Sequence, residues 1–245
     1  MGIGRIAIIL SSLAAGVALV SCTATPPFSQ ASEAQVARAD GEASLEAVYS
    51  RLAQAGGRVI RLDARSSAVR IYAFPAGSGA KFGHSHVVSA PQFTGYIYLP
   101  TGAAASPRFD LEFRLDQLEF DDPDQRSALG GAFARALSPD AVEDTRTHML
   151  GQGNMQADRF PHVRVHSLQI SGESPKFAAR VQLEMHGQTR EMWVPLSVEE
   201  LPDRASVTGS FVLRQTDFGA KPYSVLGGLL AVQDELVIEF KLVGN

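Results

Sequence analysis

The side chains best suited to chemistry in this chain are its histidines, and two of them stand close together. His84 and His86 are two residues apart, and on a strand such residues project from one face, so both imidazoles could reach one ion. Zinc or copper would suit that pair. However, Gly83 indicates a loop, and no third ligand stands at a suitable spacing. We therefore expect no metal site, with His84 and His86 solvated or at the mouth of a ligand site, and keep the metal site as an alternative.

Asp144 and His148 form the second candidate group, because residues four apart share one helix face. A single pair of this kind more often braces a helix than catalyses a reaction. The chain also has no G-x-S-x-G turn, no P-loop and no dinucleotide-binding glycine pattern. We expect a protein that is not an enzyme and needs no cofactor.

The only cysteine, Cys22, follows a segment that is typical of an export signal. One positive charge at Arg5 precedes an apolar run at residues 6–20, and a polar, proline-bearing stretch follows at 23–32. The run is too short and too interrupted for a comfortable membrane-spanning helix. Its last residues, Leu-Val-Ser-Cys, resemble the lipobox of bacterial lipoproteins, in which the cysteine is lipidated and becomes the mature N-terminus. We expect a signal peptide at 1–21 and lipidation of Cys22; the alternative is an ordinary secretory signal.

These features predict a protein on the periplasmic face of a bacterial membrane. Thr23 rather than aspartate follows the cysteine, which favours the outer membrane; otherwise the protein would be secreted or periplasmic. With Cys22 lipidated, no thiol is left for a disulfide, so the domain must be held together by its core. The net charge of −4 and the lack of a basic block argue against nucleic acid as a partner. Protein partners stay unknown from the sequence.

Residues 22–57 read as a lipidated tether with a short helix, and from residue 58 the apolar residues recur with a period of two. The cleanest strand has Phe109, Leu111, Phe113 and Leu115 alternating with polar residues. Further one-sided strands are expected around residues 58–62, 69–73, 92–99, 163–165, 177–185, 192–198, 207–213 and 236–242.

Residues 124–150 interrupt this pattern with helical spacing, and Ser138 and Pro139 suit the cap and first turn of a helix. About eight strands with one apolar face predict an antiparallel sheet closed into a barrel, with one helical insertion. A sandwich of two sheets is the main alternative.

Three pairs of segments together resemble the YceI-like family of exported bacterial proteins; they lie at residues 62–69 with 93–97, 144–150 with 160–167, and 183–190 with 214–219. The resemblance covers residues 58–245 and rests on order and spacing more than on any single motif. It implies a lipocalin-like antiparallel barrel with a helical element. It also implies an apolar ligand, because some members bind a polyisoprenoid or another long-chain amphiphile.

A long-chain ligand needs an elongated apolar cavity with few polar groups at its mouth. The inward faces of the expected strands supply candidate walls: Phe109, Leu111, Phe113, Val181, Leu183, Met185, Val194 and Phe211. We therefore expect a membrane-anchored carrier, buffer or sensor of an apolar, lipid-like molecule. Two alternatives stay open, a metal-binding barrel that uses its histidines and a structural or adaptor module with a filled core.

Overall fold

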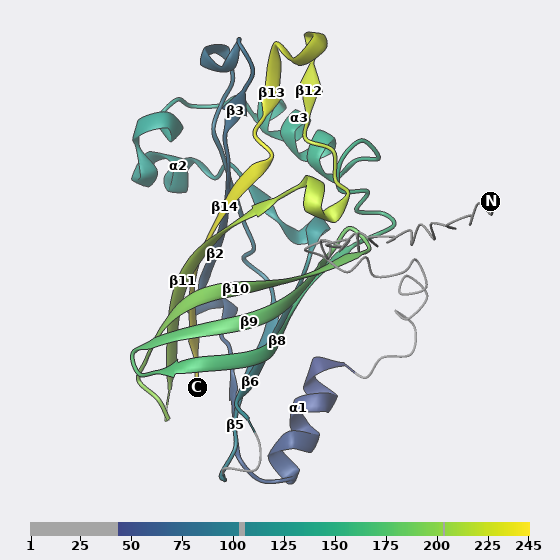
Figure 1. Ribbon diagram of the computed structural model, residues 1–245. Coiled ribbons are helices and arrows are strands. Elements are labelled where there is room, and N and C mark those ends of the chain that lie inside the picture. The colour runs from purple at the N-terminus through teal and green to yellow at the C-terminus, as the bar shows by residue number, and fades with distance from the viewer. Residues whose placement is uncertain (1–43, 103–105, 203) are drawn as a thin grey trace, which may run out of the picture.

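The main feature of the computed structural model is one curled antiparallel sheet of eleven strands (Figure 1). The structure describes residues 44–102, 106–202 and 204–245, so the predicted signal peptide and Cys22 lie outside the described residues. In spatial order the strands are β1 (Arg58–Arg61), β5 (Thr94–Leu99), β6 (Arg108–Arg114), β8 (His162–Glu173), β9 (Lys176–Met185), β10 (Gln188–Glu199), β11 (Ala205–Arg214), β14 (Glu235–Gly244), β2 (Ala68–Ala73), β4 (His86–Ser89) and β7 (Glu119–Phe120).

The curled sheet closes on itself where β1 meets the end of β14. The amide of Arg61 donates to the carbonyl of Asn245 (3.1 Å), the amide of Asn245 donates back (3.2 Å), and Leu62 forms a bridge with Gly244. The expected antiparallel barrel is therefore confirmed. The strand count exceeds the expected eight mainly because the sheet also contains the short strands β4 and β7, which the alternation did not predict. Strand β2 pairs with β14 along its length, whereas β1 pairs with β5 and reaches the end of β14 through its last residue, Arg61.

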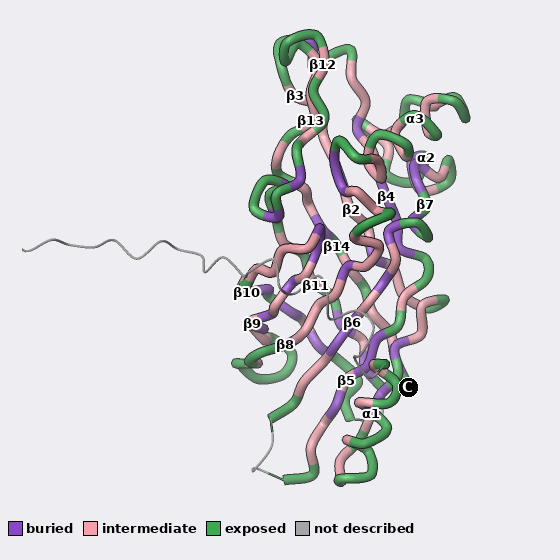
Figure 2. The backbone as a smooth tube through the Cα atoms, turned by 90° about the vertical axis from the view of Figure 1, so that its right-hand side faces the viewer, coloured by how far each residue is buried: buried purple, intermediate pink, exposed green. Residues whose placement is uncertain are grey.

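The alternation read from the sequence sets which side chains enter the barrel. Along β9, Val181, Leu183 and Met185 are buried, and the residues between them are partly exposed. The chain then turns in two residues, His186 and Gly187, both with positive φ (53° and 69°), so that Met185 pairs with Gln188. A two-residue turn of this kind matches the twist of the flanking strands. Figure 2 shows that buried positions follow the barrel strands.

A second, three-stranded sheet extends one end of the barrel. It contains β3 (Pro75–Ala76), β12 (Ser224–Val225) and β13 (Leu230–Val232), and it rises at the top of Figure 1. Two 3-10 turns cap it, η3 (Ala80–Phe82) and η7 (Leu226–Gly228), drawn as the blue and yellow coils at the top of that view. The sequence did not predict this sheet, because strands of two or three residues carry no period to recognise.

Of the three α-helices in the described residues, two lie at that same end and the third lies at the opposite end. The expected helical insertion forms α2 (Pro123–Leu129) and α3 (Pro139–Leu150). As expected, Ser138 caps α3, because its hydroxyl accepts a hydrogen bond from the amide of Ala141 (3.2 Å). In residues 44–102, 106–202 and 204–245, no helix has the length and apolarity needed to span a bilayer.

Helix α1 (Leu45–Gln54) is the short helix expected within the tether at 22–57. It packs on the outside of the barrel against β5, with Tyr49 fully buried, and so belongs to the folded unit rather than to a free spacer.

Candidate ligand-binding site

The barrel encloses a cavity of about 580 Å³. Its size lies within the range typical of small-molecule sites. All eight residues expected from the alternation line it, and they come from β6, β9, β10 and β11: Phe109, Leu111, Phe113, Val181, Leu183, Met185, Val194 and Phe211. The alternation within each strand was sufficient to identify them, because successive residues of a barrel strand point alternately into and out of the barrel.

Other strands complete the walls with residues that the sequence analysis did not select. Apart from Ile170, which follows a register shift between Ser167 and Gln169 in β8, they keep a period of two along their strands, so the signal was present in the sequence. The additional apolar residues from β2, β4, β8 and β14 are Val69, Ile71, Ala73, Val88, Val163, Val165, Ile170, Leu236, Ile238, Phe240 and Leu242.

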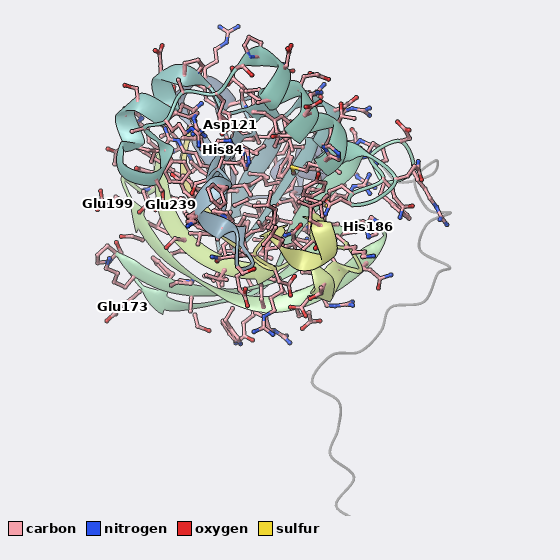
Figure 3. All side chains as sticks on the ribbon, turned by 90° about the horizontal axis from the view of Figure 1, so that it is seen from above. His84, Asp121, Glu173, His186, Glu199 and Glu239 are labelled. Carbon is pink, nitrogen blue, oxygen red and sulfur yellow. The ribbon has the colours of Figure 1, made fainter. Side chains whose placement is uncertain are left out.

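Polar groups line only one end of the cavity. They come from α3, from the segments that follow α3 and β11, from the residue before β12 and from the first residue of β4: Asp144, Thr145, His148, Asn154, Gln215, Tyr223 and His86. Asp144, His148 and Tyr223 are exposed to solvent as well, so the cavity reaches the surface at this α3 end. Figure 3 looks onto this end of the molecule.

The far end of the cavity is apolar. Leu99, Phe109 and Ile170 line it there, with Pro107 and Leu201 at the rim. Pro107 and Leu201 are exposed, so the cavity extends along the barrel from one rim to the other. A space of this kind suits a chain-like ligand that carries one polar end.

The pair Asp144 and His148 braces the polar rim, as the sequence predicted for residues four apart. His148 Nδ1 bonds the backbone carbonyl of Asp144 (2.7 Å) rather than its carboxylate, and the imidazole packs against the ring of Tyr223 with centroids 4.7 Å apart. Nearby, the amide of Asn154 donates to the side chain of Gln215 (3.2 Å). The ring contact joins α3 to the residue just before β12, and the hydrogen bond from Asn154 joins the segment after α3 to the end of β11.

His86 is held by a buried carboxylate rather than placed for a metal. Its Nδ1 lies 2.6 Å from Asp121, whose carboxylate also accepts from the amide of Val87 (3.1 Å) and from Arg126 (2.5 Å). Burial would raise the pKa of Asp121, but the bonds from His86, Val87 and Arg126 outweigh it and hold that pKa below its usual value.

The His84 ring lies near His86, with centroids 6.4 Å apart, and Figure 3 labels it beside Asp121. Burial lowers the pKa of His84, and nearby positive charge at Arg135 acts in the same direction. Across the described part of the chain, no group of three or more His, Cys, Asp or Glu side chains could hold a metal ion. The metal-binding alternative therefore receives no support from the geometry.

A cluster around Asp110, behind the cavity wall, escaped the sequence analysis. Asp110 occupies a polar position of the alternation in β6, yet α1 covers it. Its carboxylate accepts hydrogen bonds from Tyr49 (2.6 Å) and Arg108 (2.9 Å) and contacts His166 Nδ1 (2.5 Å). The Tyr49 ring also stacks on Tyr96, with centroids 4.9 Å apart. The only signal in the sequence was one large aromatic residue in a helix with a weak apolar stripe.

A curled antiparallel sheet around an elongated apolar cavity defines the class of lipocalin-like binding barrels. The chain belongs to the YceI-like family, because the family model described as "YceI-like domain" matches residues 61–244. The resemblance seen in the sequence is thereby confirmed, and the family has the fold of a binding protein.

A solved structure shows the same fold. Burkholderia cenocepacia BcnA has a TM-score of 0.55 at 15% identity, covering 75% of this chain and 99% of its own. The Campylobacter jejuni YCEI protein has a TM-score of 0.47 at 8% identity, covering 64% of this chain and 84% of its own. No curated protein sequence matches the chain.

Proposed function

We propose that this chain is an extracytoplasmic, membrane-anchored protein that binds a long-chain apolar ligand, a polyisoprenoid or similar lipid, as a carrier, buffer or sensor. The observation that carries the proposal is the cavity of about 580 Å³ with apolar walls along its length. Each methylene that leaves water for such a site contributes about 0.8 kcal/mol, before the costs of association and ordering. Binding of this kind needs no catalytic group, and His148 and His86 both serve to brace the site.

The cavity suggests the size and direction of the ligand. At about 30 Å³ for each heavy atom, the share that a water molecule takes in the liquid, it holds about twenty heavy atoms. A polar headgroup would lie among Asp144, His148 and Tyr223, and the tail would run toward Pro107 and Leu201. A longer chain would extend beyond the rim at Pro107 and Leu201.

The anchoring part of the proposal rests on the sequence around Cys22. A lipid on Cys22 would hold the barrel beside a bilayer, where a protein that exchanges a lipid-like ligand needs to be. Metabolic labelling with a fatty acid tests this part separately, because the label should enter the wild-type chain and be absent from Cys22→Ala.

Filling the cavity tests the ligand proposal directly. Val194 is buried and lines the cavity, whereas Val212 projects from the barrel wall with 57% of its surface exposed. We expect Val194→Phe to reduce the co-purified lipid about tenfold, because an added ring occupies the space of the tail, and Val212→Phe to leave it unchanged.

Native mass spectrometry of the purified proteins, followed by extraction of bound lipid, gives the measurement. Thermal melting of both variants serves as the control for folding. A wild-type chain that carries no lipid-range mass and takes up none from vesicles would contradict the proposal.

A further inference from the structure

The outermost part of the second sheet presents apolar side chains to solvent. We call the turns η3 and η7 with Leu229 the tip of the molecule. Among the described residues, Leu226 (72% exposed) and Phe82 (68%) are the most exposed of the large hydrophobic side chains, and Leu229 is 44% exposed. Figure 2 shows this end of the molecule as mostly exposed.

The tip is a built structure, because its two turns are bonded to one another. The amide of Gly79 donates to the carbonyl of Leu229 (2.8 Å). Gly77 has φ +84°, and a Cβ there would lie 2.3 Å from the carbonyl oxygen of Gly228. The backbones of the two hairpins therefore approach so closely that only glycine fits at residue 77.

Folding in water does not explain this arrangement. Leu226 is the most exposed of these side chains, and its backbone has φ +51°, in the left-handed region that non-glycine residues disfavour. Backbone strain of this kind gathers at functional sites, where the surrounding structure maintains it. An exposed leucine in a strained conformation contributes nothing to the stability of the fold in water. Contact of its side chain with another apolar phase would account for its presence here.

Charge at the tip points to the nature of that phase. The segments that form the second sheet and the tip, residues 74–83 and 220–232, contain two lysines, Lys81 in η3 and Lys221 ahead of β12, and no other charged residue, although the whole chain carries −4. Lys81 Nζ lies 5.0 Å from the centre of the Phe82 ring. Apolar side chains with neighbouring lysines are typical of segments that lie in a membrane interface, where the ammonium groups meet anionic headgroups.

The position of the tip relates it to the ligand cavity. Tyr223 and Val232, which belong to the same hairpin as η7, line the cavity at its polar end. We propose that the tip inserts into the surface of a bilayer that contains anionic lipid and so places the α3 end of the cavity against the membrane. The use of this contact for ligand transfer rests on the proposed function, whereas the contact itself does not.

A bilayer fits these features better than a protein partner. Phe82 and Leu226 are exposed on two different short turns, η3 and η7. A protein interface needs shape-complementary pockets over a large area, whereas lipid accommodates projecting side chains without such pockets.

Vesicle binding by the full chain tests the proposal. Every variant carries Cys22→Ala, so that no attached lipid contributes, and the N-terminal segment is the same throughout. With vesicles of phosphatidylethanolamine and phosphatidylglycerol in equal parts, Leu226→Ser and Phe82→Ser should each weaken binding about tenfold. Lys81→Gln should weaken it about fivefold, and vesicles of phosphatidylcholine alone should abolish that difference. Val212→Ser, at an exposed apolar position on the barrel wall (57% exposed), is the matched control and should bind like the parent.

A fluorescence measurement shows whether the tip itself enters the lipid. Trp193 is the only tryptophan, so Trp193→Phe with Leu226→Trp places one reporter at the tip. Its emission should shift to the blue with vesicles, and brominated lipid should quench it. A reporter that stays in water while the chain binds would overturn the proposal, as would equal binding by Leu226→Ser and Val212→Ser.

A blue shift without vesicles, accompanied by dimers, would instead identify the tip as a protein interface and would also overturn the proposal. Measuring the bound lipid of the same variants distinguishes insertion of the tip into a bilayer from binding of a lipid in the cavity. A chain whose tip enters vesicles but whose cavity never carries lipid would refute the proposed function alone.

Discussion

At the scale of single residues, two buried carboxylates join the barrel to the elements around it. Asp110 connects β6 to α1 through Tyr49, and Asp121 connects the end of β4 to α2 through Arg126. Burial would raise the pKa of Asp110, but hydrogen bonds from His166, Tyr49 and Arg108 hold it below its usual value. Both carboxylates are therefore stabilised as anions in the folded protein.

This predicts a loss of stability in acid. A carboxyl whose folded pKa is depressed stabilises the fold fully above its unfolded pKa of about 4, and the contribution disappears as the pH falls through the folded pKa. Urea unfolding between pH 6 and pH 3 should show stability falling below about pH 4. Asp110→Asn should lower stability at pH 6 by about 1–3 kcal/mol and flatten the acid limb.

Asp158→Asn, at an exposed position, serves as the control and should leave the whole profile close to that of the wild type. An acid limb in Asp110→Asn as steep as that of the wild type would show that the stabilisation lies elsewhere.

At the scale of elements, α3 is both a capped helix and one side of the cavity mouth. Asp144, His148 and Met149 line the cavity, so fraying of the helix changes the opening. The helix begins at Pro139 with Ser138 as its cap, and it contains no fully buried residue. It is held by partly buried apolar residues that pack on the core, Val142, Met149 and Leu150, and by Arg146, which donates to the carbonyl of Leu118 (2.8 Å).

Removing the cap should loosen the mouth. Ser138→Ala should cost about 1 kcal/mol of helix stability, increase hydrogen exchange in the first turn of α3 and accelerate ligand dissociation. Ser44→Ala is a matched control, because Ser44 caps α1 in the same way, accepting from the amide of Ala47, at the other end of the molecule. If both variants accelerate dissociation equally, α3 does not act as the side of the mouth.

The long strands and α3 were predictable from the sequence because each carries its own local signal. Alternation identified β6, β9, β10, β11 and β14, and a serine–proline pair identified the start of α3. The cluster at Asp110 was not predictable, because its burial depends on α1, which is distant in sequence. The short strands β3 and β12 were missed since they acquire their pairing only from neighbours that the sequence does not specify.

At the scale of the whole molecule, the barrel depends on a short seam. Strand β1 has four residues, and it is joined to the end of β14 by the bonds between Arg61 and Asn245, the bridge of Leu62 with Gly244 and the bond from the amide of Asp63 to the carbonyl of Val243 (2.8 Å). A Cβ at Gly244 would lie 2.7 Å from the carbonyl oxygen of Arg61. The two strands can therefore pair here only because residue 244 has no side chain.

A side chain at this position should open the seam. Gly244→Val should destabilise the fold by about 2 kcal/mol or more, because the contact is with backbone that cannot move aside. Hydrogen exchange should rise in β1 and at the end of β14 and stay unchanged in β9. Gly153→Val, where nothing lies within 4 Å of the added Cβ, is the control. Equal melting temperatures for the two variants would contradict this account of the seam.

The position of α1 decides how the barrel responds to mechanical tension. A pull on the chain ahead of Ser44 reaches α1 before it reaches β1, the strand that completes the ring. Through its hydrogen bond to Asp110, Tyr49 transfers that force to β6. The paired strands on either side, β5 and β8, then share the load. The seam between β1 and β14 is thereby protected from the force. Under tension from the N-terminal side, the barrel stays closed for as long as α1 remains packed against it.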